Sequence, residues 1–280
     1  MPIHDLGYRH WSGDWTSHPY RWWVITRQGI SLLIQKKRFL LLMILSSIPF
    51  LVRTVMIYLN TVMGNLPFLK IDAKFFEDFL NQQTFFVFII SIYAGSGLIA
   101  NDLKANALQI YLSKPITRDD YFMGKLGIVV FFLSLPTLVP GLLLFLMAVL
   151  FKSDMTFFQE NYWVLGSIVV YSLLIIFTYS LLILALSSLS KSSRFAGIGF
   201  AAVFFFSQIL SHILFGILRT NNVAWVAVGN DLIRVGDFLF GTASVRFIPP
   251  LWSAVIVLLT VLAGSVWLVH RNVRAVEVVK

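Results

Sequence analysis

The sequence has no cysteine and few charged residues. None of its 280 residues is cysteine, which excludes a disulfide framework, a thiolate metal site and a cysteine nucleophile. Charged residues make up 12% of the chain, roughly half the ~25% that is usual in soluble domains, whereas 58% of the residues are hydrophobic. This composition excludes an ordinary soluble domain and indicates an integral membrane protein.

Long apolar runs recur along the chain. Runs of about 18 or more nearly uncharged residues are typical of membrane-spanning helices. They predict an all-α integral membrane fold with six spans, at about residues 39–60, 84–100, 126–151, 162–186, 195–218 and 251–270. Pro136 and Pro140 predict a kink or break in the third span, because proline removes a helical hydrogen bond. The apolar loop over residues 217–250 predicts short helices between the last two spans.

The segment before the first span is amphipathic. In PYRWWVITRQGISLLIQKKRF (residues 19–39), a helical projection gathers most apolar residues on one arc, with polar residues opposite. A basic amphipathic helix that contains tryptophan is typical of the membrane surface, although a helix packed on a partner has the same pattern. We therefore divide the chain into a cytoplasmic tail with an amphipathic entry helix (residues 1–38) and a six-span transmembrane domain (residues 39–280).

Lysine and arginine are distributed unevenly between the two sides of the membrane. Fifteen lie on the side of both termini and residues 101–125, and six lie on the other side. The positive-inside rule makes the richer side cytoplasmic. We therefore expect a multi-pass protein of the cell's inner (plasma) membrane with both termini in the cytoplasm. The net charge of +9 is accounted for by this asymmetry and by contact with anionic membrane lipids, so no nucleic-acid partner is expected.

The stretch NDLKANALQIYLSKPITRDDYFMGK (residues 101–125) separates the second and third spans and is strongly polar. Apolar residues at helical spacing predict a helix over residues 102–113, which Pro115 ends. Thr117 is placed to cap a second helix by accepting the amide of Asp119 or Asp120. The stretch is either a solvated hairpin or a docking surface for a cytoplasmic protein.

The same stretch resembles the signature loop of type-2 ABC transporter permeases, the membrane subunits of ATP-binding-cassette exporters. That loop has an acidic and a basic residue after the second span, a Leu-Ser-x-Pro-x-x-Arg core, an aromatic residue, and Gly-Lys before the third span. The matching positions are Asp102, Lys104, Leu108, Leu112, Ser113, Pro115, Arg118, Tyr121, Gly124 and Lys125. Asn106 and Ala107 depart from it, standing where the family often has Gly-Thr. The serine-rich LALSSLSKSSRFAGIGF (residues 184–200) is similar to the family's second cytoplasmic turn.

The resemblance implies that this loop contains a coupling helix, which seats on a separate ATPase subunit. It further implies two copies of that cytoplasmic ABC ATPase, a second permease subunit, identical or related, and ATP and Mg²⁺ bound by the ATPase. The residues expected at the ATPase-coupling site are Asp102, Lys104, Leu108, Tyr111, Leu112, Ser113, Pro115, Arg118, Asp119, Asp120 and Lys125.

Two kinds of role are expected within this set. Leu108, Tyr111 and Leu112 would supply apolar contact with the ATPase, whereas Arg118, Asp119 and Asp120 would fix the register of the contact. The chain itself has no G-x-x-x-x-G-K-[ST] phosphate loop, and it lacks the H-E-x-x-H and G-x-S-x-G patterns. We therefore expect neither a catalytic residue nor a metal site or cofactor in this chain.

Three polar residues inside the spans are candidates for the translocation path. Arg53 either snorkels to the outer surface or pairs with an acid such as Asp72 or Glu77. Gln208 and His212 lie four residues apart on one helical face, where they would contact substrate or hydrogen-bond another helix.

A stand-alone channel, secondary carrier or membrane-embedded enzyme is the alternative function. A carrier normally needs several charges inside its spans or paired broken helices, and here Arg53 is the one charge well inside a span. This argues for the ABC permease. An ATPase that copurifies with the chain would distinguish the two.

Overall fold

The chain folds into helices throughout the part described by a computed structural model, which covers residues 20–63, 70–112, 116–152, 155–242 and 249–273. The first half contains α1 (Arg21–Ile34), α2 (Lys37–Ser46), α3 (Ile48–Val62), α4 (Ala73–Gly95), α5 (Ala100–Lys104), α6 (Ala107–Leu112) and α7 (Arg118–Ser134). The second half contains α8 (Leu138–Lys152), α9 (Met155–Leu189), α10 (Ser193–Leu218), the 3₁₀ helix η1 (Asn221–Val226), α11 (Val228–Leu239) and α12 (Leu251–Asn272).

Six helical segments of the described chain are long and apolar enough to cross a membrane, which confirms the predicted all-α fold and span count. They cover Lys37–Val62, Ala73–Lys104, Arg118–Phe151, Phe157–Leu189, Ser193–Leu218 and Leu251–Asn272. The short helices predicted between the last two spans are η1 and α11.

The second span begins earlier than the sequence predicts. Its helix starts at Ala73, where the Asp72 carboxylate caps it by accepting the amide of Phe75 at 3.0 Å. The predicted start near residue 84 is wrong because it excluded polar residues such as Glu77 and Gln83. Both side chains are buried among neighbouring helices, so α4 carries them inside the bundle.

The third span is broken where proline predicts it. Helix α7 ends at Ser134 and α8 begins at Leu138, with Pro136 in the turn between them. The Thr137 hydroxyl donates to the carbonyl of Leu133 at 2.7 Å and so satisfies one of the last carbonyls of α7. The first span is also divided, at Ser47 between α2 and α3.

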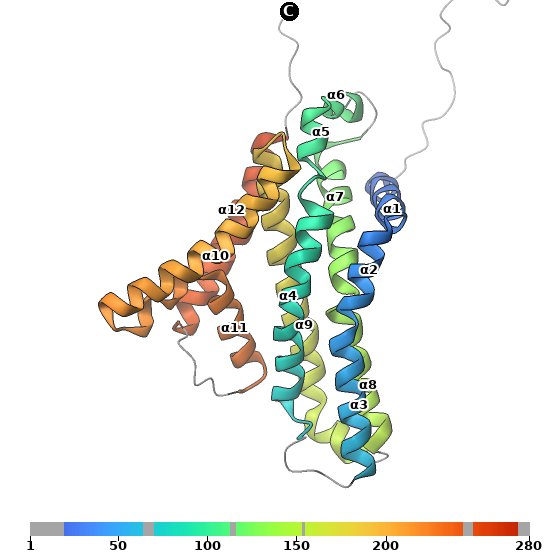
Figure 1. Cartoon of the computed structure of the whole chain (residues 1–280), viewed down its shortest axis with the longest axis vertical. Coiled ribbons are helices and arrows are strands. Elements are labelled where there is room, and N and C mark those ends of the chain that lie inside the picture. Colours follow the sequence, from blue (N-terminus) through green and yellow to red (C-terminus); the bar gives the residue numbers. More distant parts are fainter. Residues whose placement is uncertain (1–19, 64–69, 113–115, 153–154, 243–248, 274–280) are drawn as a thin grey trace, which may run out of the picture.

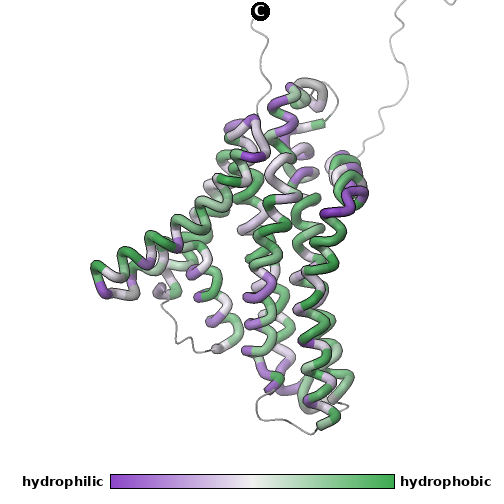
Figure 2. Tube along the Cα trace, in the orientation of Figure 1, coloured by the Kyte–Doolittle hydropathy of each residue, from purple (hydrophilic) through white to green (hydrophobic). Residues whose placement is uncertain are grey.

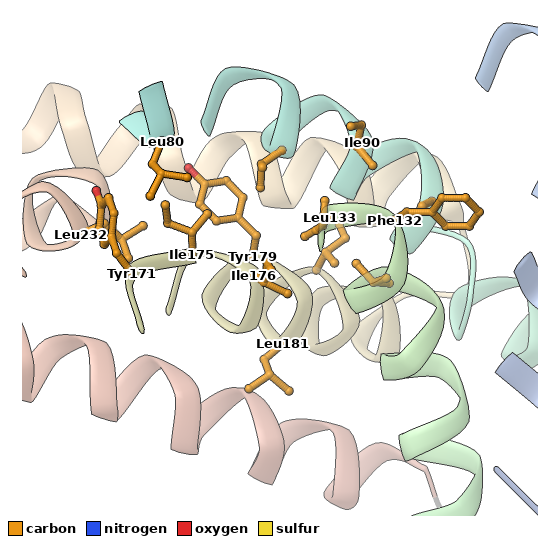
Figure 3. Packing of buried hydrophobic residues seen from close by; sticks show 14 of the residues in the cluster. Leu80, Ile90, Phe132, Leu133, Tyr171, Ile175, Ile176, Tyr179, Leu181 and Leu232 are labelled. Carbon is orange, nitrogen blue, oxygen red and sulfur yellow. The ribbon is translucent and has the colours of Figure 1, made fainter. Parts of the chain in front are cut away.

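The long helix α9 lies at the centre of the packing, in contact with α4, α7, α8, α10, α11 and α12. In Figure 1, α2–α3, α4, α7–α8 and α9 stand side by side, while α10 leans away from them. Buried side chains of α9, such as Ile175 and Tyr179, belong to one core cluster with Leu80 of α4 (Figure 3). Helices α1, α5 and α6 gather at one end of the bundle, named here the α6 end.

Candidate functional site: the α6 end of the bundle

The predicted helix over residues 102–113 is two short helices, α5 and α6, joined by a turn at Ala105 and Asn106. Asn106 has φ +52°, in the left-handed region that asparagine tolerates better than most residues. The prediction of one continuous helix is therefore wrong at this point. Ser113, Lys114 and Pro115 lie outside the described residues.

A buried ion pair joins α5 to α7. One Asp102 carboxylate oxygen, Oδ2, lies 2.7 Å from Lys125 Nζ and accepts the Tyr121 hydroxyl, also at 2.7 Å. The side chains of Lys125 and Asp102 are 8% and 18% exposed. Bonds of this kind are strong because the partners are charged and sheltered from water. The network therefore fastens the end of the second span to the start of the third.

Helix α6 folds back onto the same network. Tyr111 packs on Tyr121 with ring centroids 5.3 Å apart, and Lys125 Nζ lies 5.6 Å from the centroid of the Tyr111 ring. Burial, and then the negative charge of Asp102, raise the pKa of Tyr111, which keeps its hydroxyl neutral. Leu108 is 6% exposed. Both apolar residues thus lie against the chain's own bundle, whereas Asn106 is exposed.

The start of α7 is capped as the sequence predicts. The Thr117 hydroxyl oxygen accepts the amide of Asp120 at 3.1 Å, and the Asp120 carboxylate accepts the amide of Thr117 at 3.1 Å. This reciprocal pair is a capping box. Asp119 instead pairs with Nε2 of His270 on α12, at 3.0 Å, and is largely exposed. Arg118, between these residues, is exposed.

The serine-rich C-terminal end of α9, within the fourth span, also holds α5 in place. The buried Ser187 hydroxyl accepts the amides of Ile99 and Ala100 at 3.2 and 3.0 Å and donates to the Ser96 carbonyl at 2.8 Å. One side chain thereby satisfies backbone groups at the junction of α4 and α5. Sequence reasoning missed this role, and the serine-rich composition of residues 187–193 was its signal.

Helix α1 packs along α7 through glycine contacts. A Cβ added to Gly124 would lie 2.7 Å from Ile25 Cβ and 2.9 Å from the Trp22 carbonyl oxygen, so only glycine fits there. The Thr26 hydroxyl donates to the Gly124 carbonyl at 3.0 Å. The predicted apolar arc of α1 is therefore divided: Ile25 packs on α7, whereas Trp23 stays exposed. Its placement at a membrane surface stays a prediction.

The contact between α1 and α7 can be tested with a disulfide. A Cβ at Gly127 would lie 3.6 Å from Thr26 Cβ, within the range of disulfide-bonded pairs. Thr26→Cys with Gly127→Cys is therefore expected to cross-link under mild oxidation, and no other cysteine of the chain can compete. The mobility shift in a non-reducing gel reports the bond. Thr26→Cys with Gly166→Cys on α9 is the control, and equal yields from both pairs would contradict this packing.

The family model described as ABC-2 family transporter protein matches residues 23–267, from α1 into α12. The chain belongs to the ABC-2 transporter family. No curated protein matches it. The chain is thus a multi-pass membrane permease subunit of an ABC transporter, and the family implies partnership with an ABC ATPase subunit.

Arg53 of the permease has a different partner from those predicted. Its Nη1 donates to the Phe75 carbonyl at 3.1 Å, and its guanidinium lies 4.6 Å from the centroid of the Phe75 ring. Asp72 caps α4, and Glu77 bonds elsewhere. Within one chain Arg53 therefore does not pair with Asp72 or Glu77, and the arginine fastens α3 to the first turn of α4.

The other two path candidates lie apart from Arg53 in the permease. Gln208 Nε2 and His212 Nε2 lie 3.0 Å apart on α10, in a hydrogen bond along one helix. Helices α3 and α10 stand on opposite sides of the bundle in Figure 1. One chain therefore does not bring the three residues into a single site.

A buried polar cluster at the far end of α4 was not foreseen. Glu77 is 3% exposed; its carboxylate accepts the Thr242 hydroxyl at 2.6 Å and the Asn81 amide at 3.3 Å. Asn81 Oδ1 accepts the Tyr171 hydroxyl at 2.6 Å, which joins α4 to α9. In Figure 2, several hydrophilic residues lie along the half of α4 that is farther from the α6 end. The four-residue spacing of Glu77 and Asn81 was the available signal.

Proposed function

We propose that the permease pairs with a second permease subunit, identical or related, to form the translocation path of an exporter. Two copies of a cytoplasmic ABC ATPase, which bind ATP and Mg²⁺, would dock at the α6 end. The observation that carries this proposal is the Asp102–Tyr121–Lys125 network. It fastens α5 to α7, and Tyr111 of α6 packs on it, so these short helices are joined to the membrane helices, as an element that transmits force must be.

Force applied to α6 has three routes into the bundle. Tyr111 of α6 packs on Tyr121 at the start of α7, Leu108 is buried in the core, and Asp102 couples α5 to α7. Ser187 ties the junction of α4 and α5 to α9. A push on α6 would therefore move the second, third and fourth spans together, rather than bend a loose hairpin.

The burial of Leu108 and Tyr111 changes the expected contact with the ATPase. In the proposed complex these two residues seat α6 on its own bundle, and the exposed Lys104, Asn106 and Arg118 meet the partner. Asp119 and Asp120 serve the contact indirectly, through the His270 pair and the helix cap. The side chain of Leu112 lies outside the described residues, so its predicted contact stays a proposal.

The second permease subunit is supported by exposed apolar surface. The span Ser193–Leu218 and the span Lys37–Val62 are the least buried of the six within the described chain. Pairing through such surfaces would place Gln208 and His212 of α10, or Arg53 of α3, beside a second copy. We keep these three residues as path candidates on that basis, and add Glu77 and Asn81 of the buried cluster.

The orientation can be tested by cysteine labelling in intact cells. Single cysteines at Asn106 and at Asn272 are expected to resist an impermeant thiol reagent, because the Lys/Arg asymmetry places both in the cytoplasm. A cysteine at Asn222, in η1, should react. Disrupted cells should expose Asn106→Cys to the reagent, which controls for accessibility. Labelling of Asn106→Cys from outside would overturn the orientation.

A further inference from the structure

An apolar pocket of about 400 Å³ lies between α9, α11 and α12. Its lining consists of valine, leucine and phenylalanine alone, among them Leu174 and Phe177 of α9, Val235 of α11 and Leu258 of α12. Leu181 lines it too, and points away from the other labelled core residues in Figure 3. Such a lining cannot satisfy water or a polar ligand, so the pocket suits a hydrocarbon group.

The pocket has a buried floor and an exposed rim. On the floor, Leu258 is 2% exposed; on the rim, Val170 and Leu259 are 52% and 59% exposed. The pocket therefore opens sideways from the bundle, along the exposed faces of α9 and α12. A ligand would enter from the layer that surrounds the spans, not from either end.

Two exposed tryptophans on α12 indicate that the rim of the pocket faces membrane lipid. Trp252 and Trp267 of α12 are 70% and 57% exposed, and Val255, Ile256 and Leu259 form the exposed stripe between them. Fifteen residues of helix separate the two indoles by about 22 Å. Exposed tryptophans at both ends of an apolar stripe are typical of a lipid-facing helix. Arg271 lies 5.1 Å from the centroid of the Trp267 ring, as expected of a basic residue at an interface.

We propose that this pocket binds one acyl chain of a bilayer phospholipid. The chain would lie against Val235 and Leu239, on the apolar face of α11. The same helix carries Gly236, which lies against Tyr171, a member of the cluster around Glu77. A bound acyl chain would thereby stabilise the position of α11, which would lie between the lipid and the polar cluster around Glu77. The inference rests on the membrane spans and is independent of the ATPase contact.

Lipid retention tests the proposal. The permease, purified in mild detergent with its partners, is expected to retain a phospholipid in native mass spectrometry. Val235→Phe, which fills the pocket, should remove one phospholipid per permease chain. Ile256→Phe makes a similar change at an exposed residue of α12 that does not line the pocket, and it should leave retention unchanged. Equal retention in the two variants would overturn the proposal.

Photocross-linking locates the lipid. A phospholipid with a diazirine in its acyl chain is expected to label peptides of α9, α11 and α12 in the wild-type permease, and several-fold less in Val235→Phe. Val255→Phe is a second filling variant in case the first does not assemble. Label spread evenly over all exposed spans would contradict a specific pocket. So would a cross-link between two permease copies through Leu259→Cys in lipid vesicles.

Discussion

Replacing Asp102 by alanine is expected to destabilise the permease by about 3–5 kcal/mol, the range for removing one partner of a buried ion pair. The substitution leaves Lys125, 8% exposed, with an uncompensated charge, and it takes the acceptor from the buried Tyr121 hydroxyl. Thermal unfolding of the purified permease measures the loss. Asp102→Ala with Lys125→Met should recover much of it, because the double variant removes both charges.

The pair between Asp119 and His270 provides the matched control. It has a similar separation of 3.0 Å, but the two side chains are 79% and 44% exposed. Asp119→Ala is therefore expected to change stability by no more than about 1 kcal/mol, as for surface pairs. If Asp119→Ala is as damaging as Asp102→Ala, burial does not set the strength of these contacts.

Local features of the fold were predictable from the sequence because they depend on neighbouring residues. Apolar length identified the six spans, Pro136 identified the break in the third, and Thr117 identified the start of α7. The second span was misplaced for the same reason. A local count of polar residues at 77–83 cannot reveal that Glu77 and Gln83 find partners far away in the sequence, at Thr242 and Ser46.

At the α6 end, too, local features were predictable and long-range contacts were not. The motif singled out Asp102 and Lys125, but their contact spans 23 positions of sequence and depends on how α5 and α7 are placed in the fold. The turn at Asn106 decides which way α6 faces, and it directs Leu108 inward. For Arg53, the charge alone suggested either the outer surface or an acidic partner, whereas within the chain it contacts a carbonyl and an aromatic ring.

The second large effect is expected from Leu108→Ala. Truncating a buried leucine costs about 2–5 kcal/mol. Helix α6 has only six residues, far fewer than the roughly 12–15 that an isolated helix needs to be even marginally stable. Loss of the Leu108 contact should therefore release α6 locally while the six spans still insert. Adding Leu112→Ala should deepen the effect, and Arg118→Ala alone should be milder, because Arg118 is exposed.

Leu150→Ala is the control for this substitution. It removes the same atoms from a leucine that is 66% exposed on α8, at the opposite end of the bundle. The size and the yield of the complex with the ATPase subunit are compared for the two variants. If both are equal, a loss of activity in Leu108→Ala reflects lost coupling and not poorer expression.

The most direct test of the coupling role is ATP hydrolysis by the ATPase subunit in lipid vesicles, with each permease variant compared with the ATPase alone. The wild-type permease and Leu150→Ala are expected to change the rate of hydrolysis equally. Leu108→Ala with Leu112→Ala should return it close to the rate of the ATPase alone and should abolish transport. Full permease-dependent hydrolysis and transport in that double variant would contradict the assignment of α5 and α6 as the element that couples the ATPase to the membrane spans.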